Sequence, residues 1–376
     1  MKDLDKYRGC LIGGAVGDAL GYPVEFMSLS AIKEIYGENG ITEYELHDGV
    51  ARISDDTQMT LFTATGLLLG ETRGCVRGLA GPPWSYVWLS YKDWYRTQTE
   101  KYPMKGDHFS WLDDIPELFS RRAPGNTCMS VLAAGKEGSV KNPINNSKGC
   151  GGVMRVAPIG LHLSEGKSCW TPSIMEIGAE TAALTHGHPL GYIPAAGLSY
   201  LISLLAHTDM TLEDAAQKMI YETTCAYDDE QVLYGDFRDI IDKAWMLAEN
   251  ENISDQDAIR ELGEGWVAEE ALAIAVFCAL RYSNDFEKAI ITAVNHDGDS
   301  DSTGAITGNI LGTYLGLSKI PERFLKNLEL KDIIMEIADD LSEDCPLDSW
   351  DMEGKNEEER NWKKKYWYNN KNYTID

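Results

Sequence analysis

The sequence predicts an all-α fold in which many helices surround one core. Apolar residues recur at three- and four-residue spacing through most of the chain, as they do on one face of a helix. The alternation of apolar and polar residues that marks strands is almost absent, and no repeat of solenoid length or Pro/Gly/Ser-rich linker divides the 376 residues. We therefore expect one domain over 1–345, followed by a C-terminal extension over 346–376.

Helical periodicity locates the individual elements. In chain order the predicted helices are Thr57–Leu69, Thr171–Thr185, Leu190–His207, Thr211–Thr223, Asp236–Ala248, Val267–Tyr282, Asp285–Val294, Ser302–Leu317 and Leu330–Leu341. Three long stretches lack the pattern and are predicted to be irregular: Pro23–Ile53, Gln98–Asn126 and Gly135–Val153. Long loops in a compact domain often carry function.

Two glycine stripes predict which helices lie against each other. Glycine recurs every four residues at Gly13, Gly17 and Gly21, and again from Gly304 to Gly316. A glycine inside a helix costs about 1 kcal/mol relative to alanine, so a stripe of them needs a compensating close contact. We expect the helices around 13–21 and 302–316 to be neighbours in the core.

The composition is that of a globular protein and excludes a disordered acidic tail. Hydrophobic residues make up 43% of the chain, and 34 Lys and Arg against 60 Asp and Glu give a net charge of −26. This charge repels nucleic acid and anionic membranes, so we expect neither as a partner. The segment Lys363–Tyr368 is similar to a basic-aromatic nucleic-acid patch, but the net charge favours a docked or frayed tail.

The sequence also predicts a cytoplasmic location. The N-terminus has no signal-peptide core, and no apolar run approaches the roughly 20 residues of a membrane span. Eight cysteines are scattered without a CxxC pair, which is typical of free thiols in a reducing compartment. Cys10 and Cys278 lie in apolar helical patterns and are expected in the core.

Two clusters of acidic and hydroxyl residues precede predicted helices. They are Ser54-Asp55-Asp56-Thr57 and Asp297-Gly298-Asp299-Ser300-Asp301-Ser302. Capping and the helix dipole explain one carboxylate in each cluster, but adjacent carboxylates repel each other. Hard divalent cations bind such oxygens, so a paired Mg²⁺ or Mn²⁺ site is one interpretation. Two capped helices on an acidic surface are the other.

Four further features are candidates for a functional site. Asp18 lies in an apolar helix and needs a partner if it is buried, and Glu25 begins a long stretch that can reach a site. The glycine-rich turn Ser147–Arg155 can present N–H groups to phosphate, or it is simply a tight connection. His186 and His188 lack a neighbouring Cys or third His, which disfavours zinc and favours hydrogen bonding or substrate contact.

With these residues in view, the chain resembles the ADP-ribosylglycohydrolase family from about Tyr7 to Gly316. This family includes the dinitrogenase reductase-activating glycohydrolase and the ADP-ribosylarginine hydrolases. Six segments in order carry the resemblance: Gly17-Asp18-Ala19-Leu20-Gly21, Ser54-Asp55-Asp56-Thr57, Arg122-Ala123-Pro124-Gly125-Asn126, Gly149-Cys150-Gly151-Gly152-Val153-Met154-Arg155, Thr185-His186-Gly187-His188-Pro189 and Gly298-Asp299-Ser300-Asp301-Ser302-Thr303.

The resemblance implies a compact multi-helix domain with a binuclear metal site for two divalent cations, Mg²⁺ or Mn²⁺. It implies two groups of metal ligands, with Glu25 as an acidic residue beside them. The ligands are Ser54, Asp55 and Asp56 in one group, and Asp299, Asp301 and Ser302 in the other. The residues that match the ADP-ribose-binding positions are Ser147, Gly149, Cys150, Gly151 and His186.

The expected activity is hydrolysis that frees ADP-ribose from a modified protein side chain. The residues of the Gly298–Thr303 and Lys148–Gly151 motifs are more similar to those of arginine-type hydrolases. The resemblance therefore implies that the bond to be hydrolysed joins ribose C1″ to an arginine guanidinium. Asp55, Asp56 or Glu25 would take the proton of the attacking water. Glu269 and Glu270 are candidates to hold the guanidinium, although an exposed helix start explains them equally well.

Three alternatives to an arginine-specific hydrolase are kept open. The first is a hydrolase of another ADP-ribose linkage, such as serine-linked ADP-ribose or O-acetyl-ADP-ribose. The second is a toxin-neutralising immunity protein that uses the same fold for binding. The third is a structural role like that of the crystallin relatives, which the retention of every candidate ligand disfavours.

Overall fold

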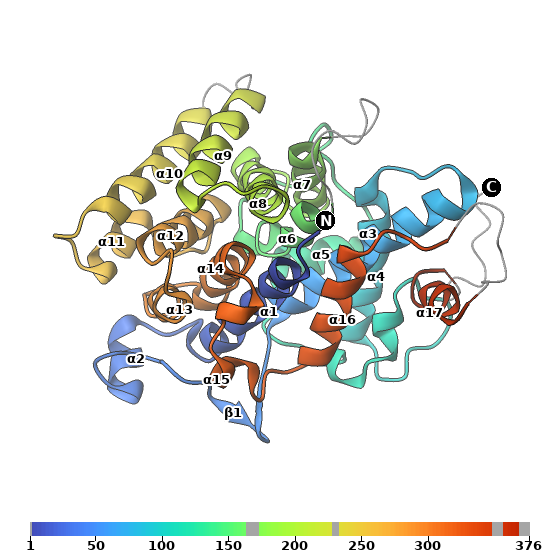
Figure 1. Ribbon diagram of the computed structural model, residues 1–376, viewed down its shortest axis with the longest axis horizontal. Helices are drawn as coiled ribbons and strands as arrows, with labels where there is room; N and C mark the ends of the chain where they lie inside the picture. The colour runs from blue at the N-terminus through green and yellow to red at the C-terminus, as the bar shows by residue number, and fades with distance from the viewer. Residues whose placement is uncertain (1, 163–172, 228–232, 348–355, 368–376) are drawn as a thin grey trace.

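The described part of the chain folds into α-helices that pack against one another (Figure 1). The computed structural model describes residues 2–162, 173–227, 233–347 and 356–367. The helices are α1 (Leu4–Gly21), α2 (Leu29–Tyr36), α3 (Asp55–Arg77), α4 (Pro83–Thr99), α5 (Asn126–Ala134), α6 (Ala157–His162), α7 (Ile174–Ala183), α8 (Pro189–His207), α9 (Leu212–Ala226), α10 (Leu233–Glu249), α11 (Asp255–Leu262), α12 (Ala268–Arg281), α13 (Phe286–Val294), α14 (Ser300–Leu315), α15 (Glu322–Leu325), α16 (Lys331–Ser342) and α17 (Glu357–Tyr366).

The all-α prediction is confirmed. Among the described residues, the strands are limited to β1 (Leu46–His47) and β2 (Val50–Ala51), which pair antiparallel. The predicted helices match α3, α7–α10, α12–α14 and α16, although α3 continues eight residues beyond its predicted end at Leu69. The first residues of the predicted helix Thr171–Thr185 lie outside the described residues.

The prediction that 23–53 is wholly irregular was wrong, because α2 and the β1–β2 pair lie within it. The helices α4, α5, α6, α11, α15 and α17 were also missed. α4 carries aromatic residues on several faces, so its three/four spacing is hidden, and α11 is short and largely polar. The stretches 98–126 and 135–153 contain only short 3₁₀ turns beyond the ends of α4 and α5, as expected.

The glycine stripes bring α1 and α14 into direct backbone contact, as predicted. A Cβ atom added at Gly17 would lie 2.0 Å from the carbonyl oxygen of Gly304, and one at Gly13 would lie 2.3 Å from that of Gly308. Side chains there would force the two helices apart. The contact runs along both helices, which lie side by side in Figure 1, and it ends where Gly21 meets the carbonyl oxygen of Ser300.

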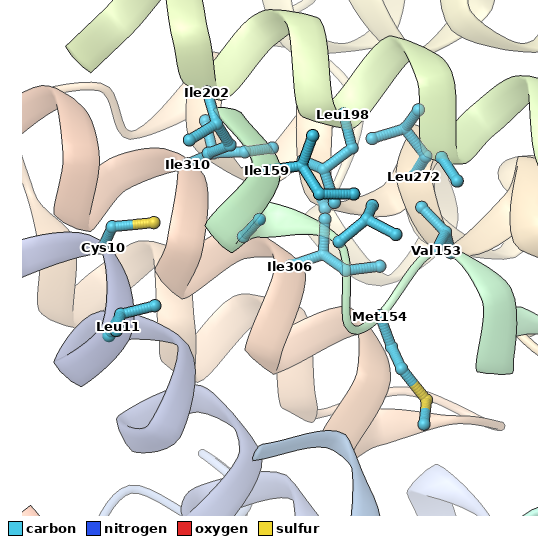
Figure 2. Close-up of a cluster of buried hydrophobic side chains, with 14 of the residues drawn as sticks. Cys10, Leu11, Val153, Met154, Ile159, Leu198, Ile202, Leu272, Ile306 and Ile310 are labelled. Atoms are coloured by element: carbon cyan, nitrogen blue, oxygen red, sulfur yellow. The ribbon is translucent and has the colours of Figure 1, made fainter. Parts of the chain in front are cut away.

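One continuous hydrophobic core surrounds this helix pair. Figure 2 shows side chains from several helices meeting there, including Cys10 of α1, Leu198 of α8 and Ile306 of α14. Cys10 and Cys278 are fully buried, as expected. In the described part of the chain, one helix, α8, is long and apolar enough to cross a membrane, and 94% of its most apolar window is buried in this core.

The last described helix, α17, docks on the rest of the molecule. Trp362 and Tyr366 are buried, and the indole Nε1 of Trp362 donates to the hydroxyl of Thr72 at 2.8 Å. Asp340 of α16 accepts hydrogen bonds from Tyr366 at 2.5 Å and from Lys365 at 2.6 Å. Lys365 is therefore paired with an acidic group, which fits a docked tail rather than a nucleic-acid patch.

Candidate active site

The start of α3 is held in place by Asp18, which is buried in α1. The Asp18 carboxylate accepts the backbone N–H of Ser54 at 2.9 Å and that of Thr57 at 3.1 Å, and the Thr57 hydroxyl also donates to it. Ser54 caps the helix by accepting the N–H of Asp56 at 3.2 Å. These are the partners that the sequence required for a buried Asp18. Its position makes Asp18 a residue that positions the acidic turn.

The start of α14 carries the second acidic group and meets the first. Asp299 caps α14 by accepting the N–H of Ser302 at 3.3 Å, and Asp301 Oδ1 accepts the same N–H at 3.0 Å. The Ser302 hydroxyl donates to Asp56 Oδ1 at 2.8 Å. The two acidic clusters, far apart in sequence, therefore form one buried group.

Glu25 completes this group from the loop that follows α1. Oxygen atoms of Glu25, Asp299 and Asp301 all lie within 4.8 Å of one another, and all three residues are buried. The Glu25 side chain is 7% exposed, and its Oε2 has no hydrogen-bond partner. A buried carboxylate oxygen without a partner is costly, so its position indicates a group that the protein itself does not supply.

The electrostatics of the group favour a cation at its centre. Burial, together with the neighbouring carboxylates of Asp299 and Asp55, raises the pKa of Glu25 to about 9. Burial is also the largest cause that raises the pKa of Asp56 and of Asp301 well above the usual range, and nearby carboxylates add to it. A divalent cation would offset both the burial and the repulsion, and carboxylate oxygens are the ligands that hard cations prefer. The donor set therefore fits a metal ion.

Asp55 lies at the edge of the group, next to the loop that leads into α5. Its Oδ2 accepts the N–H of Gly125 at 3.3 Å, and its own N–H donates to the carbonyl of Arg122 at 3.1 Å. The Arg122 guanidinium in turn pairs with Glu329 at 3.1 Å. The predicted segment Arg122–Asn126 thus reaches the site through its backbone.

The predicted ADP-ribose-binding residues also lie together. A Cβ atom added at Gly149 would lie 3.5 Å from Nε2 of the His186 ring, and one at Gly151 would lie 3.1 Å from its Cε1. The Ser147 hydroxyl is 3.1 Å from that of Thr127. The glycine turn thus wraps around the imidazole edge of His186.

His186 itself is a neutral hydrogen-bonding group. Burial lowers its pKa to about 3, and the nearby Arg155 guanidinium contributes to the shift. Its Nδ1 lies 2.8 Å from the hydroxyl of Thr185, which leaves Nε2 facing the glycine turn. This arrangement agrees with hydrogen bonding or substrate contact rather than zinc.

Cys150 connects the glycine turn to the carboxylates. Its Sγ lies 2.7 Å from Asp299 Oδ2, and its backbone N–H donates to the carbonyl of Trp266 at 3.1 Å. The carboxylate group and the glycine turn therefore form one continuous site, with Cys150 at the junction.

The two glutamates predicted near the site mouth have other partners. Glu269 is buried and pairs with Lys148. Glu270 Oε2 accepts the N–H groups of Glu264 and Gly265 at 3.0 and 3.1 Å, which orders the loop before α12. Glu264 instead lines a cavity beside Glu25. The sequence did not single out Glu264, and its placement between Gly263 and Gly265 in a helix connection was the available signal.

Comparison with known proteins places the chain in a family. A model of the ADP-ribosylglycohydrolase family matches residues 1–350. The mouse (Mus musculus) protein named ADP-ribosylhydrolase ARH3 is 23% identical over 360 residues, which cover 87% of this chain and 88% of the mouse protein. ADP-ribosyl-[dinitrogen reductase] glycohydrolase of Rhodospirillum rubrum is 23% identical over 335 residues, which cover 87% of this chain and 91% of the bacterial protein.

A solved structure supports the fold independently. A chain of an ADP-ribosylglycohydrolase-related protein complex superposes with a TM-score of 0.60 at 23% identity, covering 90% of this chain and 97% of its own length. The family match spans the acidic turns of α3 and α14 and the glycine turn together. This chain belongs to the ADP-ribosylglycohydrolase family.

Proposed function

We propose that this chain hydrolyses the bond between ADP-ribose and a modified arginine side chain of a protein, using two Mg²⁺ or Mn²⁺ ions. The family supports ADP-ribosylglycohydrolase activity, and the linkage and the metal are our proposal. One observation carries it: the acidic starts of α3 and α14 converge with Glu25 on one buried group beside the Ser147–Gly151 turn. We further propose a cytoplasmic enzyme whose partner is an ADP-ribosylated protein, with no nucleic-acid or membrane partner.

The proposed metal ligands come from the two helix starts. They are Ser54, Asp55 and Asp56 on α3, and Asp299, Asp301 and Ser302 on α14. When bound, the cations would supply positive charge that orients the ribose hydroxyls and lowers the pKa of water. Asp18 supports this set indirectly, because it fixes the backbone of Ser54 and Thr57.

Among the acidic groups, Glu25 is the one we assign to proton transfer. Its Oε2 has no protein partner, whereas Asp55 accepts the N–H of Gly125 and Asp56 accepts the hydroxyl of Ser302. In the proposed step, the oxygen of a water molecule bonds to ribose C1″ as the bond from C1″ to the guanidinium nitrogen breaks. Glu25, which a bound cation would keep ionised, takes the proton from the water and passes it to the leaving nitrogen, so the arginine side chain departs as a guanidinium.

The remaining carboxylates act on the charge of the sugar. The transition state of such a cleavage resembles an oxocarbenium ion, so negative groups fixed near C1″ stabilise it. The Ser147 hydroxyl, the Gly149–Gly151 turn and His186 are proposed to hold the ADP-ribose, with His186 neutral as its lowered pKa requires. The uncharged imidazole can therefore donate or accept one hydrogen bond at Nε2.

The experiment measures ADP-ribose release from an arginine-ADP-ribosylated protein with Mg²⁺ or Mn²⁺, compared with a serine-linked substrate. We expect arginine-linked substrate to be preferred, EDTA to stop release, and Asp299→Asn to lose activity while remaining folded. Asp209→Asn, at an exposed loop, is the matched control. Full activity without divalent cations would contradict the mechanism, and preference for the serine-linked substrate would contradict the assigned linkage.

A further inference from the structure

A cavity of about 630 Å³ opens beside Glu25, on the side of the loop that precedes α12. Its walls come from the segment after α1, from α11 and from the turns before α12 and α14. They include Glu25, Phe26, Gln256, Glu264, Trp266 and Asp297. The predicted ADP-ribose-binding residues, Ser147 to Gly151 and His186, are not part of these walls. The cavity therefore reaches the carboxylate group at Glu25, and its Trp266 wall meets the glycine turn through the N–H of Cys150.

Two aromatic rings form one wall of this cavity. Phe26 and Trp266 stack with their ring centroids 5.7 Å apart and an angle of 16° between their planes. Phe26 is 74% exposed, which is unusual for a large apolar side chain placed next to a buried catalytic group. Such an exposed aromatic face offers a surface on which a flat or positively charged group can stack.

The charge of the cavity is predominantly negative. Glu264 and Asp297 contribute exposed carboxylates, and Glu25 adds a buried acidic side chain. The one Lys or Arg among the cavity walls is Arg260, and its guanidinium is paired with Asp257 at 2.5 Å. His296 also lines the cavity, and burial lowers its pKa. Carboxylates beside an aromatic face are the combination that binds a guanidinium, through charge-assisted hydrogen bonds and stacking.

The walls are tied to the acidic turn of α14. Glu264 accepts the N–H of Asp299 through its carbonyl at 2.8 Å, and Asp297 Oδ1 accepts the N–H of Leu29 at the start of α2 at 2.8 Å. Glu270 orders the same loop from the other side. These hydrogen bonds fix the position of the cavity wall at Glu264 relative to Asp299.

We propose that this cavity receives the arginine side chain that carries the ADP-ribose, and that Phe26 and Glu264 select its guanidinium. This inference rests on the proposed function, because it assigns a binding site to the arginine side chain that is released in the same reaction. If ADP-ribose lies along the glycine turn with C1″ at the carboxylates, the arginine side chain attached to C1″ extends into the cavity beside Glu25. Phe26 and Glu264 are then specificity-determining residues, whereas Glu270 and Asp297 are positioning residues.

The test compares Phe26→Ala and Glu264→Gln on matched arginine-linked and serine-linked ADP-ribosylated peptides. We expect the ratio of kcat/KM for arginine to that for serine to fall on the order of tenfold, mainly through KM for the arginine substrate. Binding of free ADP-ribose, measured by calorimetry, should stay at the wild-type value. Ile35→Ala and Glu38→Gln, which change exposed residues outside the cavity, are the matched controls.

The outcomes separate the two proposals. Wild-type activity on arginine-linked peptides with an unchanged ratio in both variants would overturn the acceptor cavity alone. Weaker binding of free ADP-ribose in Phe26→Ala would also overturn it, because the ring would then belong to the ADP-ribose site. If the wild-type protein releases ADP-ribose from neither the arginine-linked nor the serine-linked peptide, both the proposed function and the acceptor cavity are overturned.

Discussion

The hydroxyl of Ser302 donates a hydrogen bond to Asp56 Oδ1 at 2.8 Å, although the two residues lie 246 positions apart in the sequence. This contact joins the N-terminus of α14 to that of α3, and both helices begin with acidic residues. Capping explains one carboxylate at each helix start, because it accepts free N–H groups and interacts favourably with the helix dipole. Their convergence on one buried group is what fits a cation.

Asp18→Asn should weaken metal binding, although Asp18 is not one of the proposed metal ligands. The amide keeps the shape of the side chain but loses one oxygen, so a donor among the Ser54 N–H, the Thr57 N–H and the Thr57 hydroxyl is left without an acceptor. We expect a loss of about 1–3 kcal/mol in the free energy of unfolding and lower affinity for Mn²⁺. Urea denaturation and Mn²⁺ titration measure the two effects. An unchanged Mn²⁺ affinity in the folded variant would contradict the positioning role.

Asp113 should make the protein less stable as the pH rises. Neither of its carboxylate oxygens has a hydrogen-bond partner, and burial, followed by the Asp93 carboxylate, raises its pKa from 3.8 to about 9. The unfolded chain releases this proton near pH 4 while the folded chain keeps it. Folding stability therefore falls between pH 4 and pH 9 because of this group, and it is unaffected below that range.

Asp113→Asn removes that dependence. We expect the variant to be more stable than the wild type by about 1–3 kcal/mol at pH 8, and to differ little at pH 4. Chemical denaturation at the two pH values measures the difference. Asp114→Asn, at the exposed neighbouring position, is the control and should leave the pH dependence unchanged. Equal pH dependence in wild type and Asp113→Asn would show that Asp113 is not the titrating group.

Gly17→Ala should destabilise the fold strongly. The added Cβ would lie 2.0 Å from the carbonyl oxygen of Gly304, and neither backbone can move alone in the α1–α14 contact. We expect a loss of about 3 kcal/mol in the free energy of unfolding. Gly74→Ala in α3 is the control, because its Cβ would meet only Ala80 at 3.5 Å. That change should stabilise the protein by about 0.5–1 kcal/mol, and destabilisation equal to that of Gly17→Ala would refute the packing argument.

Trp362→Ala should show that the C-terminal helix contributes to the stability of the whole fold. The Trp362 side chain is 4% exposed and reaches Thr72 on α3. We expect a loss of about 3–5 kcal/mol, as for other buried tryptophans. Lys364→Ala, at an exposed position of the same helix, is the control and should change stability little. Separate unfolding of α17 with no change in the main transition would indicate an independent extension.

Several features of this fold could be predicted from residue patterns because they depend on local spacing. The glycine stripes identified the α1–α14 pair, and the acidic clusters before α3 and α14 identified a shared chemistry. Other helices were not predicted, among them α2, α4, α5 and α11. α4 begins at Pro82-Pro83 after a glycine, which is typical of a loop, and its aromatic residues obscure its apolar face.

Other features depend on tertiary contacts that spacing does not encode. The role of Glu270 arises only when the Gly263–Gly265 loop folds back onto it, so its carboxylate is used by the backbone rather than by a ligand. Phe26 has no periodic context, and its significance appears only where its ring stacks on Trp266. Such sites are assembled from single residues of short connections, where hydrophobic periodicity carries no signal.

The number of Mn²⁺ ions bound per chain tests the central claim most directly. The claim is that the acidic starts of α3 and α14, joined by the contact of Ser302 with Asp56, form one binuclear site for two divalent cations. Equilibrium dialysis of the purified protein should give two saturable Mn²⁺ ions per chain, and Asp56→Asn and Asp301→Asn should each lower that number or its affinity. No saturable Mn²⁺ binding by the wild type, or binding unchanged in both variants, would contradict the account.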